Sequence, residues 1–378
     1  MRQDISVEPA RDLKNPGKLY FYNNYVFINE VREGIHVIDN TDPKNPQEVA
    51  FINIPGNVDM AVQGNILYAD NYIDLLAIDI TDPASPVQAG RAEQVFNALW
   101  YDDNQQKYCV YYDVVETTET VDCGSITRNG GGIFFNGGFL GMENIDVAAP
   151  SADASGSGVG GSMARFTLSN GHLYTVDDTN LRVFSLAAPL QPSLVNTVGM
   201  GWGIETIFPY EHYLFVGSTN GMYIYDNTNA TAPGYVAQLA HANACDPVFV
   251  SGDYAYVTLR DGTFCEGFDN QLDLVNITNI YSPYVEKTFP MDHPHGLSID
   301  NNTLFLCEGE NGLKVFDVAD PLKLDKNQLD YIKNIDAYDV ISVPGQDHVL
   351  LLIGKDGFYQ YDVTDPKNLK LLSKIEVK

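Results

Sequence analysis

The chain has 378 residues, of which 44% are hydrophobic and 11% aromatic, and its 50 acidic and 22 basic residues give a formal net charge of −28. A surface this negative repels phosphate backbones and anionic membranes, so we expect no nucleic-acid partner, while cationic ligands, metal ions and basic protein surfaces stay open. No apolar run approaches the roughly 18 residues that a membrane-spanning helix needs.

The first residues, Met1-Arg2-Gln3-Asp4-Ile5, lack the apolar stretch of a signal peptide. Two origins fit this start: a cytosolic protein, or a mature chain from which an export signal has been removed. The five cysteines do not decide between them. We expect residues 1–15 to form an N-terminal arm and residues 16–378 to form the folded domain.

One phrase recurs from residue 34 onward: a turn, a short apolar strand, and then Asp-Pro or a close substitute. The strand Gly34-Ile35-His36-Val37-Ile38-Asp39 precedes Thr41-Asp42-Pro43, and the strand Leu75-Leu76-Ala77-Ile78-Asp79 precedes Thr81-Asp82-Pro83. Further copies lie at 181–184, 221–226, 272–275, 312–317 and 357–362. A repeat length of about 45 residues is typical of propeller blades.

A β-hairpin precedes most copies of the phrase, and a further strand follows it. The dipeptide Gly64-Asn65, between two apolar runs, is such a hairpin turn. Helical periodicity with caps is absent. We therefore predict an all-β fold, a single β-propeller of about eight four-stranded blades, with seven as the alternative because the third unit lacks the Asp-Pro phrase. The units are 17–56, 57–95, 96–161, 162–202, 203–243, 244–294, 295–337 and 338–378.

These phrases resemble the LVIVD repeat family, which is named for a strand of the type seen at 75–79. The segments Asn15-Pro16-Gly17-Lys18 and His295-Gly296-Leu297 extend the similarity to bacterial cell-envelope members of that family, many of them lipoproteins. The resemblance implies a β-propeller, export to the bacterial periplasm or cell surface, and a lipid anchor preceding this sequence, with 1–15 as the remnant of a tether. It names no substrate, because the family has no common chemistry.

The repeated Asp-Pro turns have two interpretations. Recurring acidic residues suggest calcium binding, but Asp side chains also satisfy backbone donors in turns, and Pro fixes φ at the next position. We favour the structural interpretation. Since these turns join the third and fourth strands, they should all lie on one rim of the propeller.

The opposite rim carries the strongest functional signal. In a propeller, the innermost strand of each blade starts near one mouth of the central channel, and we call these positions the channel mouth. Aligning the units places Gly17 there in the first unit and Ala164 or Arg165 in the fourth. With Trp202, which lies between two glycines nearby, the candidate ligand-binding residues are Asp59, Asn97, Arg165, Glu205, Asp246, His295, Asp339 and Trp202.

Three interpretations of the channel mouth remain open, because carboxylates that converge on one axis repel each other unless they are solvated, protonated or shared with a cation. The acids are structural, or they hold a metal ion, or Arg165 anchors an organic or peptide ligand with paired hydrogen bonds. In the second case a divalent cation is the candidate cofactor. Its ligands would be Asp59, Glu205, Asp246, Asp339 and His295.

A glycine-rich insertion at about 123–162 and the cysteines complete the candidate features. The phenylalanines of the insertion suggest contact with the disc or a partner, and local packing within the insertion is the alternative. Cys245 and Cys265 are a disulfide candidate, and a zinc site built from them with His241 and His293 matches no known spacing.

Known catalytic signatures are absent, including His-Glu-x-x-His, Gly-x-Ser-x-Gly and the phosphate-binding loop. We predict a non-enzymatic exported binding or scaffold module, with a protein or small-molecule partner on the channel-mouth face. The alternative is a hydrolase or lyase that uses the channel carboxylates, with or without a metal ion.

Overall fold

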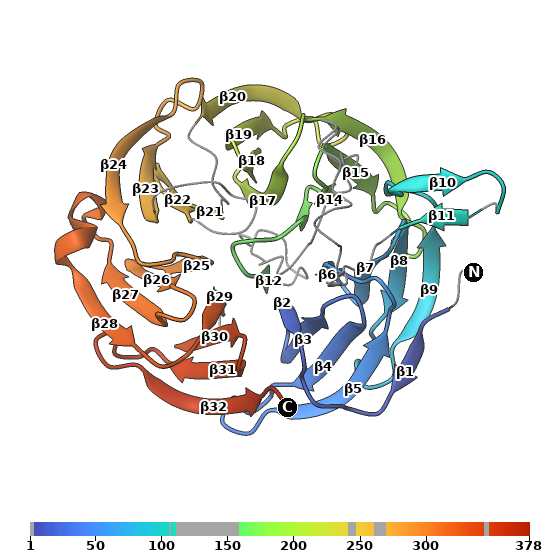
Figure 1. Cartoon of the computed structure of the whole chain (residues 1–378), viewed down its shortest axis with the longest axis horizontal. Helices are drawn as coiled ribbons and strands as arrows, with labels where there is room; N and C mark the ends of the chain where they lie inside the picture. Colours follow the sequence, from blue (N-terminus) through green and yellow to red (C-terminus); the bar gives the residue numbers. More distant parts are fainter. Residues whose placement is uncertain (1–3, 106, 111–158, 241–246, 261–269, 344–347) are drawn as a thin grey trace, which may run out of the picture. The chain divides into compact units, whose positions relative to one another are not determined.

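The computed structural model describes residues 4–105, 107–110, 159–240, 247–260, 270–343 and 348–378. The chain divides into two compact units, one made of residues 1–96 and 146–378 and the other of residues 97–145. The larger unit is a β-propeller, and the first of the four strands of each blade lies towards the middle of the ring (Figure 1).

The propeller has seven blades, each an antiparallel sheet of four strands in sequence order, and blade 1 is extended by one further strand on each side. The strands of blades 1 to 4 are β2 (Pro16–Tyr22), β3 (Tyr25–Glu30), β4 (Gly34–Asp39) and β5 (Gln47–Asn53); β6 (Met60–Gln63), β7 (Ile66–Asn71), β8 (Asp74–Asp79) and β9 (Val87–Ala92); β13 (Phe166–Ser169), β14 (His172–Val176), β15 (Asn180–Ser185) and β16 (Ser193–Gly199); and β17 (Ile204–Tyr210), β18 (Tyr213–Ser218), β19 (Gly221–Asp226) and β20 (Gly234–Ala240). The strands of blades 5 to 7 are β21 (Val248–Ser251), β22 (Tyr254–Leu259), β23 (Gln271–Asn276) and β24 (Tyr284–Pro290); β25 (Leu297–Asp300), β26 (Thr303–Cys307), β27 (Leu313–Asp317) and β28 (Gln328–Ile332); and β29 (Ala337–Ser342), β30 (Val349–Gly354), β31 (Gly357–Asp362) and β32 (Lys370–Glu376).

The expectation of eight blades is wrong, and the seven-blade alternative is confirmed. Where it is described, the third predicted unit, 96–161, forms only a hairpin of β10 (Trp100–Asp102) and β11 (Lys107–Cys109) and the short strand β12 (Val159–Gly160). The hairpin lies in the smaller unit, and β12 pairs with β2 of blade 1. Strands of two or three residues without the apolar phrase cannot bury the faces that a blade must bury.

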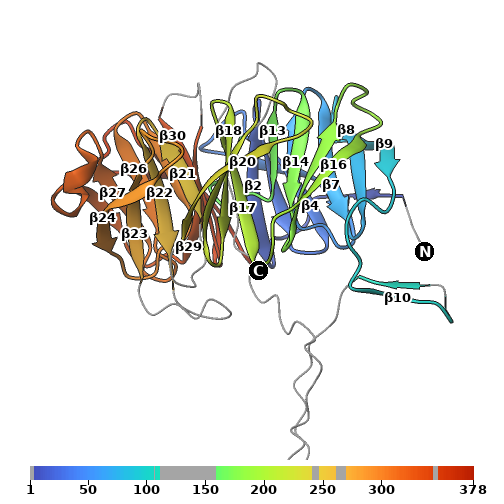
Figure 2. The same ribbon diagram turned by 90° about the horizontal axis from the view of Figure 1, so that it is seen from above.

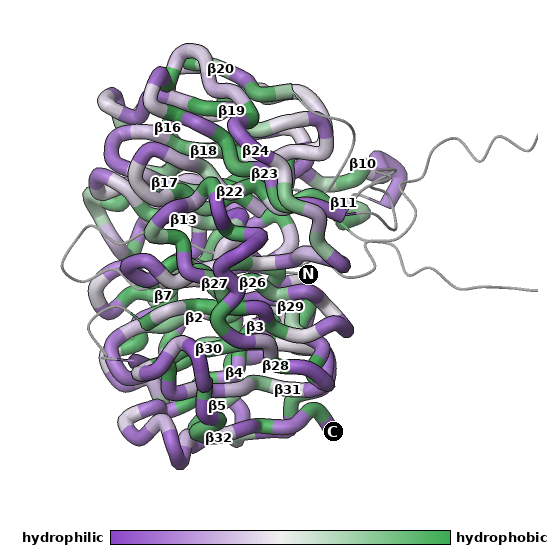
Figure 3. The backbone as a smooth tube through the Cα atoms, turned by 90° about the vertical axis from the view of Figure 1, so that its left-hand side faces the viewer, coloured by the Kyte–Doolittle hydropathy of each residue, from purple (hydrophilic) through white to green (hydrophobic). Residues whose placement is uncertain are grey.

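The apolar strands are covered on both faces because each blade packs between two neighbours. Leu350, Leu351, Leu352 and Ile353 of β30, consecutive residues that point to opposite faces, are all fully buried. Hydrophobic residues follow the strands and hydrophilic ones gather at many of the turns (Figure 3). The helical element in the described ranges is the 3-10 helix η2 (Pro321–Lys326), and no helix found there has the length and apolarity to cross a membrane.

The turns between the third and fourth strands use two acids as acceptors for backbone N–H groups: the Asp of Asp-Pro, as when Asp42 Oδ1 accepts the Lys44 N–H at 3.0 Å, and the Asp that ends the third strand. Asp39 Oδ1 accepts hydrogen bonds from the Thr41 N–H at 2.9 Å and the Thr41 hydroxyl at 2.6 Å. The same pair of bonds recurs at Asp79, Asp226 and Asp362. Hydrogen bonding to the threonine lowers the pKa of each of these four carboxyls. These bonds support the structural interpretation of the repeat.

The ring closes where blade 7 meets blade 1 (Figure 1), and the strands of the blades run through the thickness of the ring (Figure 2). The side-chain amides of Asn40 and Gln360 exchange two hydrogen bonds across this junction, at 2.9 and 2.7 Å, and both residues are fully buried. Near the chain ends, Leu13 forms a parallel bridge to Val377. The N-terminal arm adds β1 (Ser6–Glu8) to the outer edge of β5.

Candidate functional site

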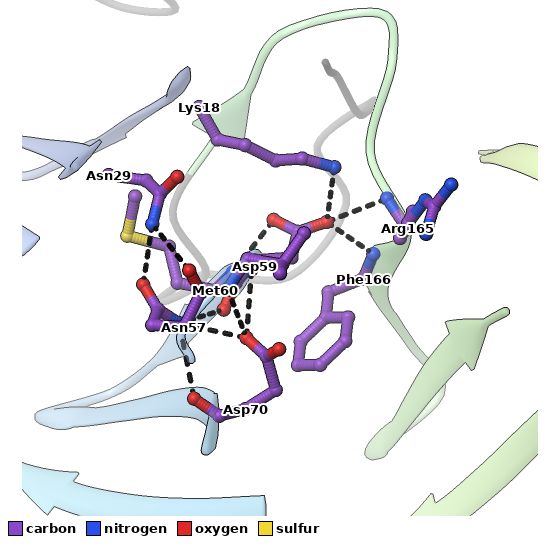
Figure 4. Close-up of polar contacts among 9 residues, drawn as sticks. Lys18, Asn29, Asn57, Asp59, Met60, Asp70, Arg165 and Phe166 are labelled. Atoms are coloured by element: carbon purple, nitrogen blue, oxygen red, sulfur yellow. Dashed lines mark hydrogen bonds and ion pairs between the residues drawn. The ribbon is translucent and has the colours of Figure 1, made fainter. Parts of the chain in front are cut away.

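A buried carboxylate links three blades at the channel mouth (Figure 4). Asp59 precedes β6 in blade 2, and its Oδ2 accepts hydrogen bonds from the Lys18 Nζ of blade 1 at 3.1 Å and from two backbone N–H groups of blade 3. Those groups are the N–H of Arg165, at 2.7 Å, and that of Phe166, at 3.0 Å. Its Oδ1 accepts the Met60 N–H at 2.7 Å. The carboxylate is therefore engaged on both oxygens.

Lys18 is the cation that balances Asp59, and both residues are only 3% exposed. Burial lowers the pKa of Lys18 below its ordinary value, and the Asp59 carboxylate opposes this effect. The positive charge of Arg165 lowers the same pKa further. One carboxylate thus lies among two basic side chains, and the two basic groups repel each other.

A second acid, Asp70 at the end of β7, positions the segment that carries Asp59. Asp70 Oδ1 accepts the N–H groups of Val58 at 2.8 Å and Asp59 at 2.9 Å, together with the side-chain amide of Asn57 at 2.8 Å. Burial raises the pKa of Asp70 to about 6, although the hydrogen bonds from Asp59 and Val58 act against the rise. Asp70 therefore fixes the backbone on which the Asp59 side chain is carried.

This supporting acid recurs in other blades. Glu30 of blade 1 accepts the N–H groups of Lys14 and Asn15, and it pairs with His36 of β4 at 2.8 Å. Glu308 of blade 6 accepts the N–H groups of two residues that lead towards β25, and it pairs with Lys314 of β27 at 2.7 Å. Each acid ends or follows the second strand of its blade and accepts hydrogen bonds from the loop that precedes the first strand. The sequence analysis did not predict these supporting acids. In blades 1 and 6 a local signal exists, because the acid lies six residues before its basic partner (30 and 36, 308 and 314).

Asp339 of blade 7 is sealed by backbone from two directions. A Cβ atom on Gly161 would lie 1.7 Å from Asp339 Oδ2, and one on Gly296 would lie 2.3 Å from Oδ1. Asp339 is fully buried. The neighbouring Ser162 Oγ accepts the Leu297 N–H of blade 6 at 2.6 Å. Together with the pairing of β12 on β2, these contacts carry residues 159–162 across the channel, past blades 1, 7 and 6 (Figure 1).

His295 lies in a hydrogen-bonded chain of three side chains. Arg260 Nη1 contacts His295 Nδ1, and His295 Nε2 lies 3.1 Å from His293 Nδ1. A guanidinium can only donate, so His295 Nδ1 must accept, and the proton of a neutral imidazole then sits on Nε2. That proton is directed to His293 Nδ1. A metal ion on His295 Nε2 would require its removal, so this arrangement disfavours His295 as a ligand.

Some of the predicted site residues lie together in the structure, and others lie at a position different from the one expected. Asp59 and Arg165 lie next to each other at the channel mouth. Lys18 lies where Gly17 was expected, because a register shift between Pro16 and Leu19 adds a residue to β2. A similar shift between Ile204 and Thr206 leaves Glu205 outside the pairing of β17 with β18. Trp202 is 62% exposed in the turn before β17.

Five further candidates lie in the smaller unit or outside the described residues. Asn97 begins the smaller unit. Asp246, Cys245, Cys265 and His241 lie outside the described residues. Within the part of the chain that the structure describes, no three His, Cys, Asp or Glu side chains are grouped to hold a metal ion. The divalent-cation site and the disulfide stay predictions.

Comparison with known proteins identifies the repeat and the fold. The LVIVD repeat matches residues 56–93 and 243–287, which contain the strands of blade 2 and most of blade 5. A search of curated proteins found no match.

Several solved structures share the architecture. The periplasmic gluconolactonase PpgL of Pseudomonas aeruginosa is 11% identical, with 96% of each chain covered and a TM-score of 0.59. A functionally unknown protein from Desulfotomaculum acetoxidans is 8% identical, with 95% of each chain covered and a TM-score of 0.56. The computationally designed Ika8 protein is 9% identical, covering 98% of this chain and 90% of its own, with a TM-score of 0.55. At such identities the likeness shows the fold alone.

Proposed function

We propose that this chain, an LVIVD-repeat β-propeller, is a non-enzymatic binding or scaffold module that holds a ligand or protein partner at its channel-mouth face. The observation that carries the proposal is the state of two channel carboxylates, Asp59 and Asp339. Asp59 has both oxygens engaged in hydrogen bonds, and Asp339 is enclosed by Gly161 and Gly296. Both acids serve the fold.

A hydrolase or lyase needs an acid or base that reaches the reacting atoms and exchanges a proton with them. Asp59 and Asp339 are 3% and 0% exposed, so neither meets this condition in the folded protein. His295, which that alternative combines with the channel carboxylates, uses both ring nitrogens in its contacts with Arg260 and His293. Binding, in contrast, requires no proton transfer from these groups.

Two side chains of the same face suit a ligand better. Trp202 is largely exposed between Gly201 and Gly203, both at positive φ, in the turn that leads into β17. Arg165 immediately precedes β13, and since β13 and β17 are both innermost strands, the two residues belong to the same rim. An exposed indole offers a large apolar surface, and a guanidinium offers directed donors.

We also propose that the module works in the bacterial cell envelope. The resemblance of its repeats to cell-envelope proteins supports this location. Fractionation of the source cells, followed by detection with an antibody against the propeller, tests it. Recovery in the cytosolic fraction alone would contradict it.

The function is tested by measuring turnover and binding on the same preparation. We expect no hydrolysis of gluconolactone, nitrophenyl esters or nitrophenyl glycosides above the rate in buffer. A lactone is included because one structural neighbour is a gluconolactonase. Binding of a ligand panel is followed by tryptophan fluorescence, with a Trp202→Phe variant to assign the signal. Turnover that disappears in a folded Asp59→Asn variant, and persists in Asp320→Asn, would establish the enzyme instead.

A further inference from the structure

We infer that the ligand of the channel mouth is an oxyanion, a carboxylate or phosphate group, which is bound by the guanidinium of Arg165. This inference rests on the proposed binding function and names the chemical class of its ligand. It concerns a small molecule or a chain end that carries such a group.

The Arg165 side chain is half-buried, and the described residues supply no carboxylate partner for it. Its Nε is enclosed without a hydrogen-bond partner, and no ion pair or side-chain hydrogen bond joins the guanidinium to the described residues. Its backbone N–H is held by Asp59 Oδ2 at 2.7 Å, so the residue is anchored at the main chain. The side chain points away from the Lys18–Asp59 pair (Figure 4).

Four other enclosed cations among the described residues have carboxylate partners. Lys18 pairs with Asp59, Arg91 with Asp74, Arg182 with Asp177 and Lys314 with Glu308. In a chain with 50 acidic and 22 basic residues, a partner for Arg165 would be easy to supply. Leaving a half-buried charge unpaired is costly, since the group has lost part of its hydration without gaining an ion pair. A bound anion would offset that cost.

The surrounding charges select the sign of the ligand. Arg165 acts on Lys18 as a repelling positive charge, so a cationic ligand would meet two basic groups. The nearby Asp59 carboxylate is already engaged by Lys18 and by backbone N–H groups. A planar guanidinium presents paired donors whose spacing matches the two oxygens of a carboxylate or phosphate. The site therefore favours an oxyanion over a neutral sugar or a metal ion.

The first test needs no ligand. Replacing Arg165 by Met keeps most of the apolar stem and removes the unpaired charge, so we expect the thermal midpoint of the ligand-free protein to rise by roughly 1–2 °C. Lys18→Met is the comparison, and it should lower the midpoint, because it leaves the Asp59 carboxylate buried without its cation. If Arg165→Met lowers the midpoint as Lys18→Met does, the guanidinium is structural and the inference fails.

The second test is calorimetric titration with succinate and with inorganic phosphate, at an ionic strength held constant with sodium chloride. We expect saturable binding of at least one anion and a loss of at least tenfold in affinity in Arg165→Gln. Lys44→Gln, which makes the same change of charge in an exposed turn on the opposite rim, should bind as the wild type does. Binding of succinate alone identifies a carboxylate site, and binding of phosphate alone a phosphate site.

Two results overturn the inference and separate it from the proposed function. Anion binding that is equal in wild type and Arg165→Gln, or absent from both, removes Arg165 as an oxyanion anchor. The binding function survives that result if a neutral ligand of the fluorescence panel still binds and Trp202→Phe weakens it. Turnover of that ligand would contradict the proposed non-enzymatic function. The anion titration of wild type and Arg165→Gln would still decide whether Arg165 binds an oxyanion.

Discussion

The Lys18 ammonium of blade 1 lies 3.1 Å from Asp59 Oδ2 of blade 2, and the same oxygen accepts two backbone N–H groups of blade 3. A single carboxylate therefore joins three consecutive blades beside the channel. The pair is buried, so its energy depends on both partners being present.

Asp59→Asn should destabilise the propeller by about 3 kcal/mol, because the variant leaves the Lys18 charge buried without an anion. Urea unfolding at pH 7 measures the loss. Asp320→Asn, which breaks the exposed pair with Lys323, makes the same chemical change and should alter stability little. Equal effects of the two substitutions would mean that Lys18 is solvated or neutral in the folded protein.

Asp70 should make the propeller less stable as pH rises through the window from about 4 to 6. Its pKa is raised from 3.8 to about 6 by burial, so in that window the folded state holds a proton that the unfolded state has lost, and stability falls with rising pH. Asp70→Asn keeps an oxygen for the N–H groups of Val58 and Asp59 and cannot ionise. The difference in unfolding free energy between wild type and variant, measured from pH 4 to 8, should change across this window. A constant difference would contradict the raised pKa.

Gly161→Ala should cost about 2 kcal/mol or more, because the new methyl group would overlap the Asp339 carboxylate. Gly199→Ala is the matched control, since a Cβ there meets nothing within 4 Å. Combining Gly161→Ala with Asp339→Ala should recover part of the loss, and a double-mutant cycle measures that coupling. Strict additivity would show that residues 159–162 do not pack on Asp339.

The repeat and the hairpin turns were enough to predict four-stranded blades, because both depend on local patterns of two to six residues. Asp59 and Arg165, which the alignment of the units placed at the starts of innermost strands, immediately precede β6 and β13. The blade count failed at one unit, 96–161, where length suggested a blade that its residues do not build.

Lys18, Asp70 and the crossing segment 159–162 could not be predicted from the sequence in the same way. Lys18 was displaced by one position because of the irregular register in β2, and nothing local marks such an irregularity. The partners of Asp59 lie 41 and 106 positions away along the chain, so their meeting depends on how blades 1, 2 and 3 pack. The enclosure of Asp339 by Gly161 likewise requires the chain to return to the channel after residue 158.

The reciprocal amide pair of Asn40 and Gln360 makes a last prediction about ring closure. Asn40→Ala should destabilise the propeller by about 2 kcal/mol, because it leaves the Gln360 Oε1 atom buried without its donor, while Gln360 Nε2 keeps its hydrogen bond to Ser373 Oγ at 3.2 Å. Asn65→Ala, in an exposed turn, is the control for the loss of an asparagine side chain. The double variant Asn40→Leu with Gln360→Leu should recover much of the loss, since neither residue then leaves a polar group unsatisfied. If Asn40→Ala costs no more than Asn65→Ala, packing between β2 and β30 closes the ring without the amide pair.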